Sequence, residues 1–376
     1  MKKILLVVIC LIGIVESALS VEKADSVANA TRMLEQISSP KVRRSWFAVP
    51  IGFYQEETSV GFGATGGYYF KSHDLSKISS ISGSVIYTLN NQAKININPR
   101  FYVLNNKMYL TGNVSLRHYP DHYYGIGNTP PVDDFLYTAQ NFAINFQPFY
   151  LFNPRVMLGL YVGVRGERLL LADSVVAQRP YIEQTYGAAG WDPYFVWGVG
   201  VQFAYDSRDN GFYPQKFSNF LKFSCVTYQK ALGSDYSLTS FTLDFRQYIP
   251  TWLGQVFAWQ VYYDMRLGRD VPFQMLPTLG GSDQLRGFRE RKFTNNSLFL
   301  VQAEYRIPIW HRLKAAVFCS VGDVFDVYNP AIHKVKVGYG AGLRFRLNDA
   351  RVNLRLDVAG NNFGEVKFYI TATEAF

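Results

Sequence analysis

The sequence predicts an all-β fold, a sixteen-stranded antiparallel transmembrane β-barrel, on three observations. Segments of about 10 to 14 residues alternate apolar and polar side chains, and this period of two is typical of strands. After residue 20, no segment offers the 18 uninterrupted apolar residues that indicate a membrane-spanning helix. Tyr (26), Phe (29) and Gly (30) are abundant and charged residues make up only 18% of the chain, which favours strands and tight turns over helices.

The alternation is clearest near the end of the chain. From 336 to 347 every odd position is apolar, while the even positions hold Lys, Gly or Arg. From 351 to 358 the even positions are apolar instead, and only residues 347–350 remain for a turn between the two segments. Barrel strands expose apolar side chains to lipid and polar side chains to the lumen, so the mean hydropathy of −0.04 does not exclude membrane insertion.

Sixteen segments share this construction, and most are long enough to cross a bilayer when tilted. They lie at about 47–55, 58–71, 77–90, 93–104, 107–118, 139–152, 155–168, 193–206, 217–229, 236–249, 254–265, 297–308, 312–323, 335–347, 350–360 and 365–376.

The connections between these segments indicate the kind of barrel. Long connections at 119–138, 169–192 and 266–296 are expected to alternate with short turns such as Asn90-Asn91 and Asn153-Pro154. Short periplasmic turns and long outer loops are typical of outer-membrane barrels. A soluble β-sandwich is the alternative, but it does not place polar residues on one face of nearly every strand and long loops at one end.

The chain divides into three predicted parts. Residues 1–20 form a signal peptide, with a basic start, a short apolar stretch and a small-residue cleavage site that ends at Ser20. Residues 21–46 form a short periplasmic segment with a helix at 25–37, too short for a folded domain. Residues 47–376 form the barrel.

The last predicted strand ends in an aromatic residue, Phe376, and resembles the C-terminal recognition signal of outer-membrane barrels. The alternation places Glu374 on the lipid face, where a charge near the interface costs about 0 to 1 kcal/mol. It also places Cys225 and Cys319 outward as small apolar groups. Neither cysteine has the spacing of a metal site, and no disulfide framework is expected.

Two motifs stand apart from the strand pattern. The first lies between predicted strands eleven and twelve and reads Gly280-Gly281, followed by Leu285-Arg286-Gly287-Phe288. The second lies between strands eight and nine and reads Asp206-Ser207-Arg208-Asp209, followed by Pro214. With these motifs, the chain over residues 46–376 resembles the bacterial surface antigen superfamily, which includes BamA, TamA and the two-partner secretion transporters.

The resemblance implies that the long loop between strands eleven and twelve folds back into the barrel lumen, where its Arg286 pairs with acidic wall residues. A planar guanidinium can hold a carboxylate by two hydrogen bonds in such a partly desolvated place. Glu304 matches the family's acidic residue on strand twelve. The family's second acid, in an Asp-x-Gly pattern on strand thirteen, has no direct match. The sequence reads Ser320-Val321-Gly322 there, with Asp323 one step further, so the second partner stays open.

The resemblance also implies a function, which is outer-membrane protein assembly or translocation in a Gram-negative bacterium. The family's periplasmic POTRA domains, which receive clients, have no counterpart in residues 21–46. We therefore expect unfolded barrel clients and a periplasmic or lipoprotein partner that acts in trans, with outer-membrane lipid around the barrel.

A passive anion channel or a structural outer-membrane barrel is the alternative function. Arg344, Arg346, Arg351 and Arg355 all have lumen-facing parity, and a ring of such charges can select anions. The formal net charge of +9 could also indicate a nucleic-acid partner. None is expected, because the basic residues fall on strand faces and form no run or aromatic RNA motif.

An enzyme is not expected either. His118 and His122 form the one close histidine pair, which the pattern places near an outer loop with no supporting serine motif. We predict no catalytic residue, no metal site and no cofactor.

Overall fold

A computed structural model describes residues 44–55, 59–71, 77–129, 135–171, 188–330 and 334–376. The predicted signal peptide and the predicted helix at 25–37 lie outside these described residues. Within them, no helix is long and apolar enough to span a membrane. The first strand begins at Arg44, three residues before the predicted start of the barrel.

Eighteen strands are present in the described part of the chain. They are β1 (Arg44–Gln55), β2 (Ser59–Phe70), β3 (Ser79–Thr88), β4 (Ala93–Val103), β5 (Met108–Tyr123), β6 (Phe135–Leu151), β7 (Val156–Leu171), β8 (Tyr194–Asp206), β9 (Ser218–Tyr228), β10 (Leu238–Pro250), β11 (Val256–Leu267), β12 (Thr278–Leu279), β13 (Phe293–Thr294), β14 (Ser297–Trp310), β15 (Leu313–Phe325), β16 (Lys336–Arg346), β17 (Asn353–Asn361) and β18 (Val366–Ala372). Short 3-10 turns η2 (Lys230–Leu232), η3 (Trp252–Gly254) and η4 (Phe273–Met275) lie in connections.

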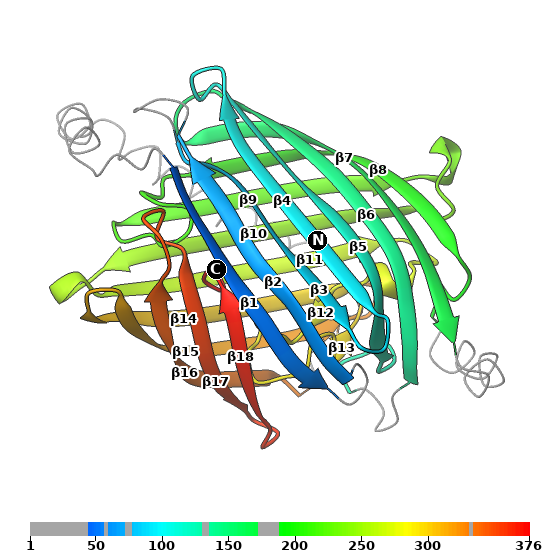
Figure 1. Cartoon of the computed structure of the whole chain (residues 1–376). Coiled ribbons are helices and arrows are strands. Elements are labelled where there is room, and N and C mark those ends of the chain that lie inside the picture. Colours follow the sequence, from blue (N-terminus) through cyan, green and yellow to red (C-terminus); the bar gives the residue numbers. More distant parts are fainter. Residues whose placement is uncertain (1–43, 56–58, 72–76, 130–134, 172–187, 331–333) are drawn as a thin grey trace.

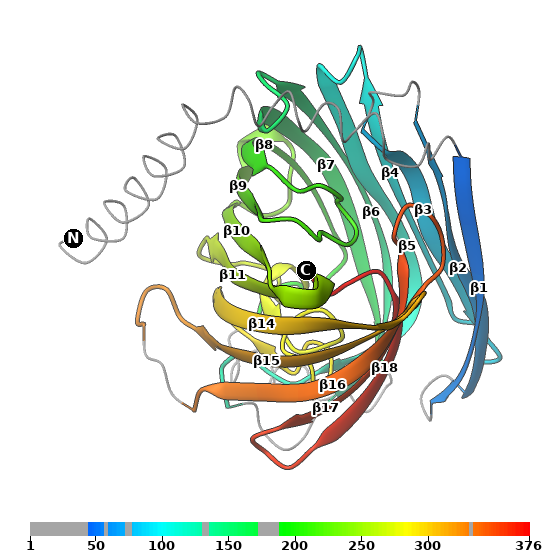
Figure 2. The ribbon, with the colours of Figure 1, turned by 90° about the vertical axis from the view of Figure 1, so that its left-hand side faces the viewer.

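Sixteen of these strands form one antiparallel sheet in which each strand pairs with its neighbour in the chain, from β1 to β11 and then from β14 to β18. The tilted strands curve around a common interior (Figures 1 and 2). The prediction of a sixteen-stranded antiparallel barrel is confirmed. The remaining strands, β12 and β13, form a two-residue hairpin inside the long connection between β11 and β14.

The two ends of the barrel differ in their connections. We call the end that carries residues 229–237 and 268–296 the loop end, and the end that carries residues 104–107 and 251–255 the turn end. The Asn90-Asn91 turn joins β3 to β4 and therefore lies at the loop end, so the predicted strict alternation of short and long connections is wrong there. The left-handed backbone at Asn91 (φ 57°) closes this tight turn, and asparagine tolerates such a backbone better than most residues.

β5 and β6 extend further toward the loop end than predicted. Their ladder continues to Tyr123 opposite Phe135, which shortens the predicted loop 119–138 and places His122, like His118, on a strand. The extension has a physical reason, because Tyr123 and Tyr137 point inward and are buried in the lumen. The pairing of β5 with β6 therefore extends as far as their inward side chains find packing partners in the lumen.

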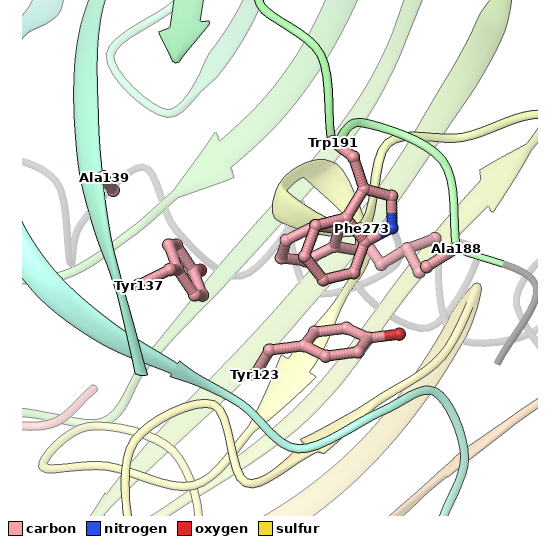
Figure 3. Close-up of a cluster of buried hydrophobic side chains, with 7 residues drawn as sticks. Tyr123, Tyr137, Ala139, Ala188, Trp191 and Phe273 are labelled. Atoms are coloured by element: carbon pink, nitrogen blue, oxygen red, sulfur yellow. The ribbon is translucent and has the colours of Figure 1, made fainter. Parts of the chain in front are cut away.

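Those tyrosines belong to an aromatic cluster near the loop end (Figure 3). Phe273 lies with its ring centroid 4.6 Å from that of Tyr123 and 5.1 Å from that of Trp191. The backbone joins the same contact, since Phe273 N–H donates to the carbonyl of Ala189 at 2.9 Å. Parts of two connections, 188–193 and 268–277, are thus packed onto the inner wall of β5 and β6.

The two faces of the sheet have the predicted polarity. Large apolar side chains such as Leu160, Val201 and Phe368 are exposed on the outer face, while inward positions are polar and mostly buried. Cys319 is exposed and Cys225 is half-buried, both on the outward side. An apolar outer band and a polar interior match a barrel that spans a membrane.

The end of the chain departs from the prediction. β18 ends at Ala372 rather than at Phe376, because Thr373 adopts a left-handed backbone (φ 75°) that turns the following residues inward. In Figure 2 the C-terminal end of the described chain lies inside the curve of the sheet. Glu374 is therefore not on the lipid face, and its side chain is only 2% exposed within the lumen.

Candidate functional site

The long connection between β11 and β14 enters the lumen, and glycines shape its turn. Gly280 and Gly281 have φ values of 115° and 116°, which glycine adopts far more easily than other residues. The loop then descends to Leu285 and Phe288, both fully buried against Leu279, Phe293 and neighbouring wall residues. The inward fold that the resemblance implied is present.

Arg286 lies at the tip of this loop and contacts both β14 and β17. Its Nη1 is 2.9 Å from Oε2 of Glu304 and 2.8 Å from Oδ2 of Asp357. Its guanidinium also lies 3.4 Å from the ring centroid of Phe318 on β15. Arg286, Glu304 and Asp357 are all fully buried. The structure therefore brings Arg286 to Glu304, and it gives Asp357 as the second acidic partner.

Asp323, the other acid considered from the sequence, has different partners. Its Oδ1 is 2.6 Å from Nζ of Lys336, and its Oδ2 accepts a hydrogen bond from Asn128 at 3.4 Å. The register explains this, because Asp323 lies beside the loop end of β15, whereas Glu304 and Asp357 lie deeper along their strands.

Three arginines of the barrel wall complete the surroundings of Arg286. We use the name lumen cluster for the whole group, which consists of Arg286, Glu304, Arg306, Arg344, Arg355 and Asp357. Arg344 bridges both acids, with Nη2 3.0 Å from Glu304 Oε2 and Nη1 against Asp357 Oδ1. Arg306 pairs with Glu304 at 2.9 Å. Arg355 lies 3.4 Å from Asp357.

The charges of this cluster are compensated locally. Besides Glu304 and Asp357, the arginines contact Glu374, which is 2.8 Å from Arg344 Nε, and Asp283, which is 2.7 Å from Arg355 Nη2. Four arginines therefore face four carboxylates. Arg344 and Arg355 are fully buried in these contacts, so they do not form the free ring of charge that an anion filter needs.

Glycines in the wall let the loop lie close against it. A Cβ at Gly338 of β16 would stand 2.1 Å from the carbonyl oxygen of Arg286. A Cβ at Gly342 would stand 2.0 Å from Oδ1 of Asp357, and one at Gly287 would stand 2.6 Å from the carbonyl oxygen of Gly360. Side chains at these positions would displace the loop or its acid.

Hydrogen bonds to the loop backbone fix the tip further. Gly287 N–H donates to the hydroxyl of Tyr369 at 3.0 Å, and that hydroxyl donates to the carbonyl of Phe288 at 3.0 Å. The amide of Asn361 donates to the carbonyl of Gly287 at 2.7 Å. Both side chains come from β17 and β18, so the loop tip is held by the last two strands of the barrel.

The second motif lies at the turn end, in the connection 207–217 between β8 and β9. Asp206 holds Arg208, with Nη2 to Oδ2 at 2.7 Å, and Asp209 Oδ1 accepts from the N–H of Gln215 at 2.9 Å. Burial lowers the pKa of the Arg208 guanidinium, but the Asp206 carboxylate outweighs it and holds that pKa above its ordinary value. Pro214 is buried beside this turn.

The same connection reaches the far side of the barrel. Asp209 Oδ2 is 2.7 Å from Nη1 of Arg351, and Asn210 donates to the carbonyl of Ala350 at 3.1 Å, both in the turn between β16 and β17. Tyr213 is buried, with Nζ of Lys314 3.3 Å from its ring centroid. The second motif therefore ties β8 and β9 to β15, β16 and β17.

Phe376 occupies an inner pocket near the turn end rather than the lipid face. It is 4% exposed and packs with Tyr248, Val256 and Ala258 of β10 and β11. Arg306 donates to the main-chain oxygen of Phe376 at 3.1 Å and lies 5.7 Å from its ring centroid. Since Arg306 also pairs with Glu304, this pocket adjoins the lumen cluster.

Asp357 was missed by the sequence reasoning, although a local signal was present. Several lumen-facing pairs have an acid and an arginine two residues apart on one strand, as in Glu304 with Arg306 and Asp244 with Arg246. Asp357 forms the same pattern with Arg355. Within the described part of the chain, no group of three or more metal-ligating side chains is found.

Comparisons with known proteins agree with this geometry. A family model described as the Omp85 superfamily domain matches residues 76–376. No curated protein matches the sequence. Among solved structures, BamA from Haemophilus ducreyi lacking POTRA domains 1-3 is similar with a TM-score of 0.58 at 14% identity, over 88% of this chain and 69% of that one.

Two further structures have the same fold. CdiB from Acinetobacter baumannii has a TM-score of 0.55 at 13% identity, over 88% of this chain and 59% of that one. CdiB from Escherichia coli has a TM-score of 0.55 at 10% identity, over 89% and 63%. This chain thus spans less than two-thirds of either CdiB chain. Because the family model covers most of the barrel, the chain belongs to the Omp85 superfamily and is an outer-membrane β-barrel protein.

Proposed function

We propose that this barrel takes part in the assembly of outer-membrane proteins or in translocation across the outer membrane, together with partner proteins that act in trans. The observation that carries the proposal is the loop held inside the lumen through Arg286, Glu304 and Asp357. A loop fixed by buried charges partly fills the lumen. A partly filled lumen is more compatible with a barrel that handles polypeptides than with an open pore. Superfamily membership supports the same class of function.

The geometry supports a specific role for the lumen cluster in this function. The loop tip contacts β14, β17 and β18, and the inward-turned residues 374–376 contact the same arginines. The cluster therefore links the last strands of the barrel to its interior. We propose that it sets the position of these strands while a client or a translocated segment passes.

A channel for anions is the second candidate, and exposed lumen cations favour it. Arg100 on β4 is exposed with lumen-facing parity, and Lys94 on the same strand is half-buried. They line the part of the wall formed by the early strands, away from the loop tip. The pairing of Arg344 and Arg355 with acids counts against this candidate.

The test is depletion of the protein in its host, followed by quantification of folded outer-membrane and secreted proteins. An assembly or translocation role predicts selective loss of particular barrel or exported proteins. Wild-type protein should restore them, and Arg286→Ala should not, although it is inserted in the membrane.

The matched control is Arg312→Ala, which removes an exposed arginine from the turn between β14 and β15. It should restore the lost proteins as well as wild type does. Unchanged protein levels on depletion, together with a high single-channel conductance that Arg286→Ala leaves unaltered, would contradict the proposal and favour the channel.

A further inference from the structure

A row of polar side chains crosses the outward face of β5, β6 and β7. The strand register places His118 opposite Gln140, and Gln140 opposite Arg168. These positions share the outward parity of Leu116, which is 45% exposed on β5. The rest of this surface presents apolar side chains to lipid, so a row of polar side chains on it requires an explanation.

The height of the row on the barrel gives part of that reason. Along β7 the outward positions Leu158, Leu160 and Val162 are apolar, and Arg168 follows Leu158 by ten residues (168 − 158). Ten residues of strand span about 33 Å. At a tilt of about 40° this is about 25 Å of height, the thickness of the apolar band of outer-membrane barrels. This height places Arg168 near the loop-end edge of the band, where lipid headgroups begin, with one more apolar outward residue, Leu170, beyond it on β7.

A hollow lies directly beside this row, on the side of the apolar band. It has a volume of about 450 Å³, and it is lined by Phe142, Gly166 and Phe195, by the polar row, and by neighbouring residues of lumen-facing parity such as Glu167. Gly166 stands opposite Phe142 on one side and Phe195 on the other, and the two ring centroids are 6.3 Å apart. A Cβ at Gly166 would stand 2.3 Å from the Phe142 ring. Because Gly166 has no side chain, the Phe142 ring can lie over it, and the floor of the hollow is aromatic.

The polar row can donate hydrogen bonds outward. The Gln140 side-chain nitrogen lies 3.1 Å from Nδ1 of His118. When Gln140 donates to that nitrogen, the ring proton of His118 sits on Nε2 and remains available as a donor. Arg168 is exposed and adds a permanent positive charge with several donors.

The carboxylates near Arg168 are engaged elsewhere. Glu167 faces the lumen and pairs with Arg165 at 2.6 Å, and Asp121 pairs with Arg117 at 3.1 Å. Asp235 accepts the N–H of Phe195 at 2.6 Å. Among the described residues, no carboxylate forms an ion pair with Arg168, so within this part of the chain its positive charge on the outer face has no acidic partner.

We propose that this surface binds a lipid whose phosphate headgroup carries a net negative charge, in the leaflet at the loop end. The phosphate would accept hydrogen bonds from Arg168, Gln140 and His118, and an acyl chain would lie in the hollow over Phe142 and Phe195. A lipid is the occupant rather than a free anion, because the donors adjoin an apolar hollow on the membrane-facing side. The site is separate from the lumen cluster and does not depend on the proposed function.

The test is native mass spectrometry of the purified full chain in zwitterionic detergent, titrated with phosphatidylglycerol and, separately, with phosphatidylcholine. Wild type should retain phosphatidylglycerol preferentially. Arg168→Gln should weaken that binding about tenfold, which corresponds to about 1.4 kcal/mol. The matched control is Arg269→Gln, which removes an exposed arginine from the connection between β11 and β14 and should leave the binding unchanged.

Two further measurements keep the proposal open to refutation. Gly166→Ala should weaken phosphatidylglycerol binding without any change of charge, because the Phe142 ring must move into the hollow. Equal concentrations of inorganic phosphate should not displace the lipid. Equal binding of both lipids, an unchanged affinity of Arg168→Gln in a heat-modifiable folded barrel, or displacement by inorganic phosphate would overturn the assignment.

Discussion

Replacement of Arg286 by alanine should release the lumen loop without unfolding the barrel. The substitution removes the ion pairs of Nη1 with Glu304 and Asp357 and the cation–π contact with Phe318. It leaves the sixteen-stranded ladder intact, since Arg286 lies outside every strand. The loop should therefore open locally, while the strand pairing of the sheet and its resistance to denaturation stay unchanged.

The size of the effect follows from what remains around the two acids. Loss of one partner from a buried ion pair costs about 3 to 5 kcal/mol when the other charge is left alone. Here Glu304 keeps Arg306 and Arg344, and Asp357 keeps Arg344 and Arg355. The cost should thus be nearer that of a hydrogen bond between charged groups, about 1.5 to 3 kcal/mol. This corresponds to an open population about 10 to 150 times larger.

Limited proteolysis of the barrel in membranes measures this population, because cleavage follows the open fraction when opening is fast. We expect cleavage within residues 280–292 to accelerate by the factor given above, while Arg312→Ala behaves like wild type. Heat-modifiable mobility on gels should show that the barrel remains folded. Cleavage at the wild-type rate, in a folded Arg286→Ala barrel, would refute the assigned role of the lumen cluster.

Three further perturbations test neighbouring parts of the account. Gly342→Ala should also release the loop, since its Cβ would stand 2.0 Å from Asp357, whereas Gly211→Ala, with no atom within 4 Å, should be neutral; equal proteolysis of the two would contradict this. Phe376→Ala should lower the free energy of unfolding by up to about 3 to 5 kcal/mol, while Phe368→Ala, at a residue 76% exposed on the lipid-facing side, leaves no internal cavity and should cost less in the same urea titration. Burial raises the pKa of Glu365, but hydrogen bonds from Lys292 and Asn361 outweigh it and hold that pKa below its ordinary value. The stabilisation by Glu365 is thus complete above a pH of about 4.3 and is lost as the pH falls through the lowered pKa. Acid-induced loop proteolysis should therefore be weaker in Glu365→Gln than in wild type, and identical pH profiles would count against the Lys292 bridge.

The sequence predicts the strands well because each strand has two different solvents on its two faces. The segment from 336 to 347 shows this, since its odd positions face outward and Arg344 faces the lumen, as predicted. Lipid on one side and a polar interior on the other impose the period of two along the whole strand. The number of strands and the face on which most side chains lie therefore follow from local pattern alone.

The ends of the strands were less predictable, because they depend on distant contacts. β5 continues to Tyr123 because an aromatic cluster receives that side chain, and β18 stops at Ala372 because Phe376 finds a pocket on β10 and β11. Neither partner is close in sequence. A continued alternation at 373–376 resembles a strand, although the chain turns inward at Thr373.

The lumen cluster was predictable in part. Arg286 and Glu304 have the parity and loop position from which their pairing was expected, and they lie 2.9 Å apart. Asp357 was not chosen over Asp323 from the sequence, although the alternation gives Asp357 inward parity and gives Asp323 the outward parity of Cys319. The two acids also differ in their depth along the barrel. Asp357 is the partner of Arg286 because the loop tip rests at its depth, against Gly338 and Gly360.

Hydrogen–deuterium exchange of the protein in outer-membrane vesicles tests the central claim most directly. The N–H of Gly287 donates to Tyr369, and the residues around it are buried, so this loop tip should exchange as slowly as the paired strand β14. Arg286→Ala should bring the exchange of the loop tip to that of exposed connections. A loop tip that exchanges rapidly in the wild-type protein would contradict a lumen loop held by Arg286, Glu304 and Asp357.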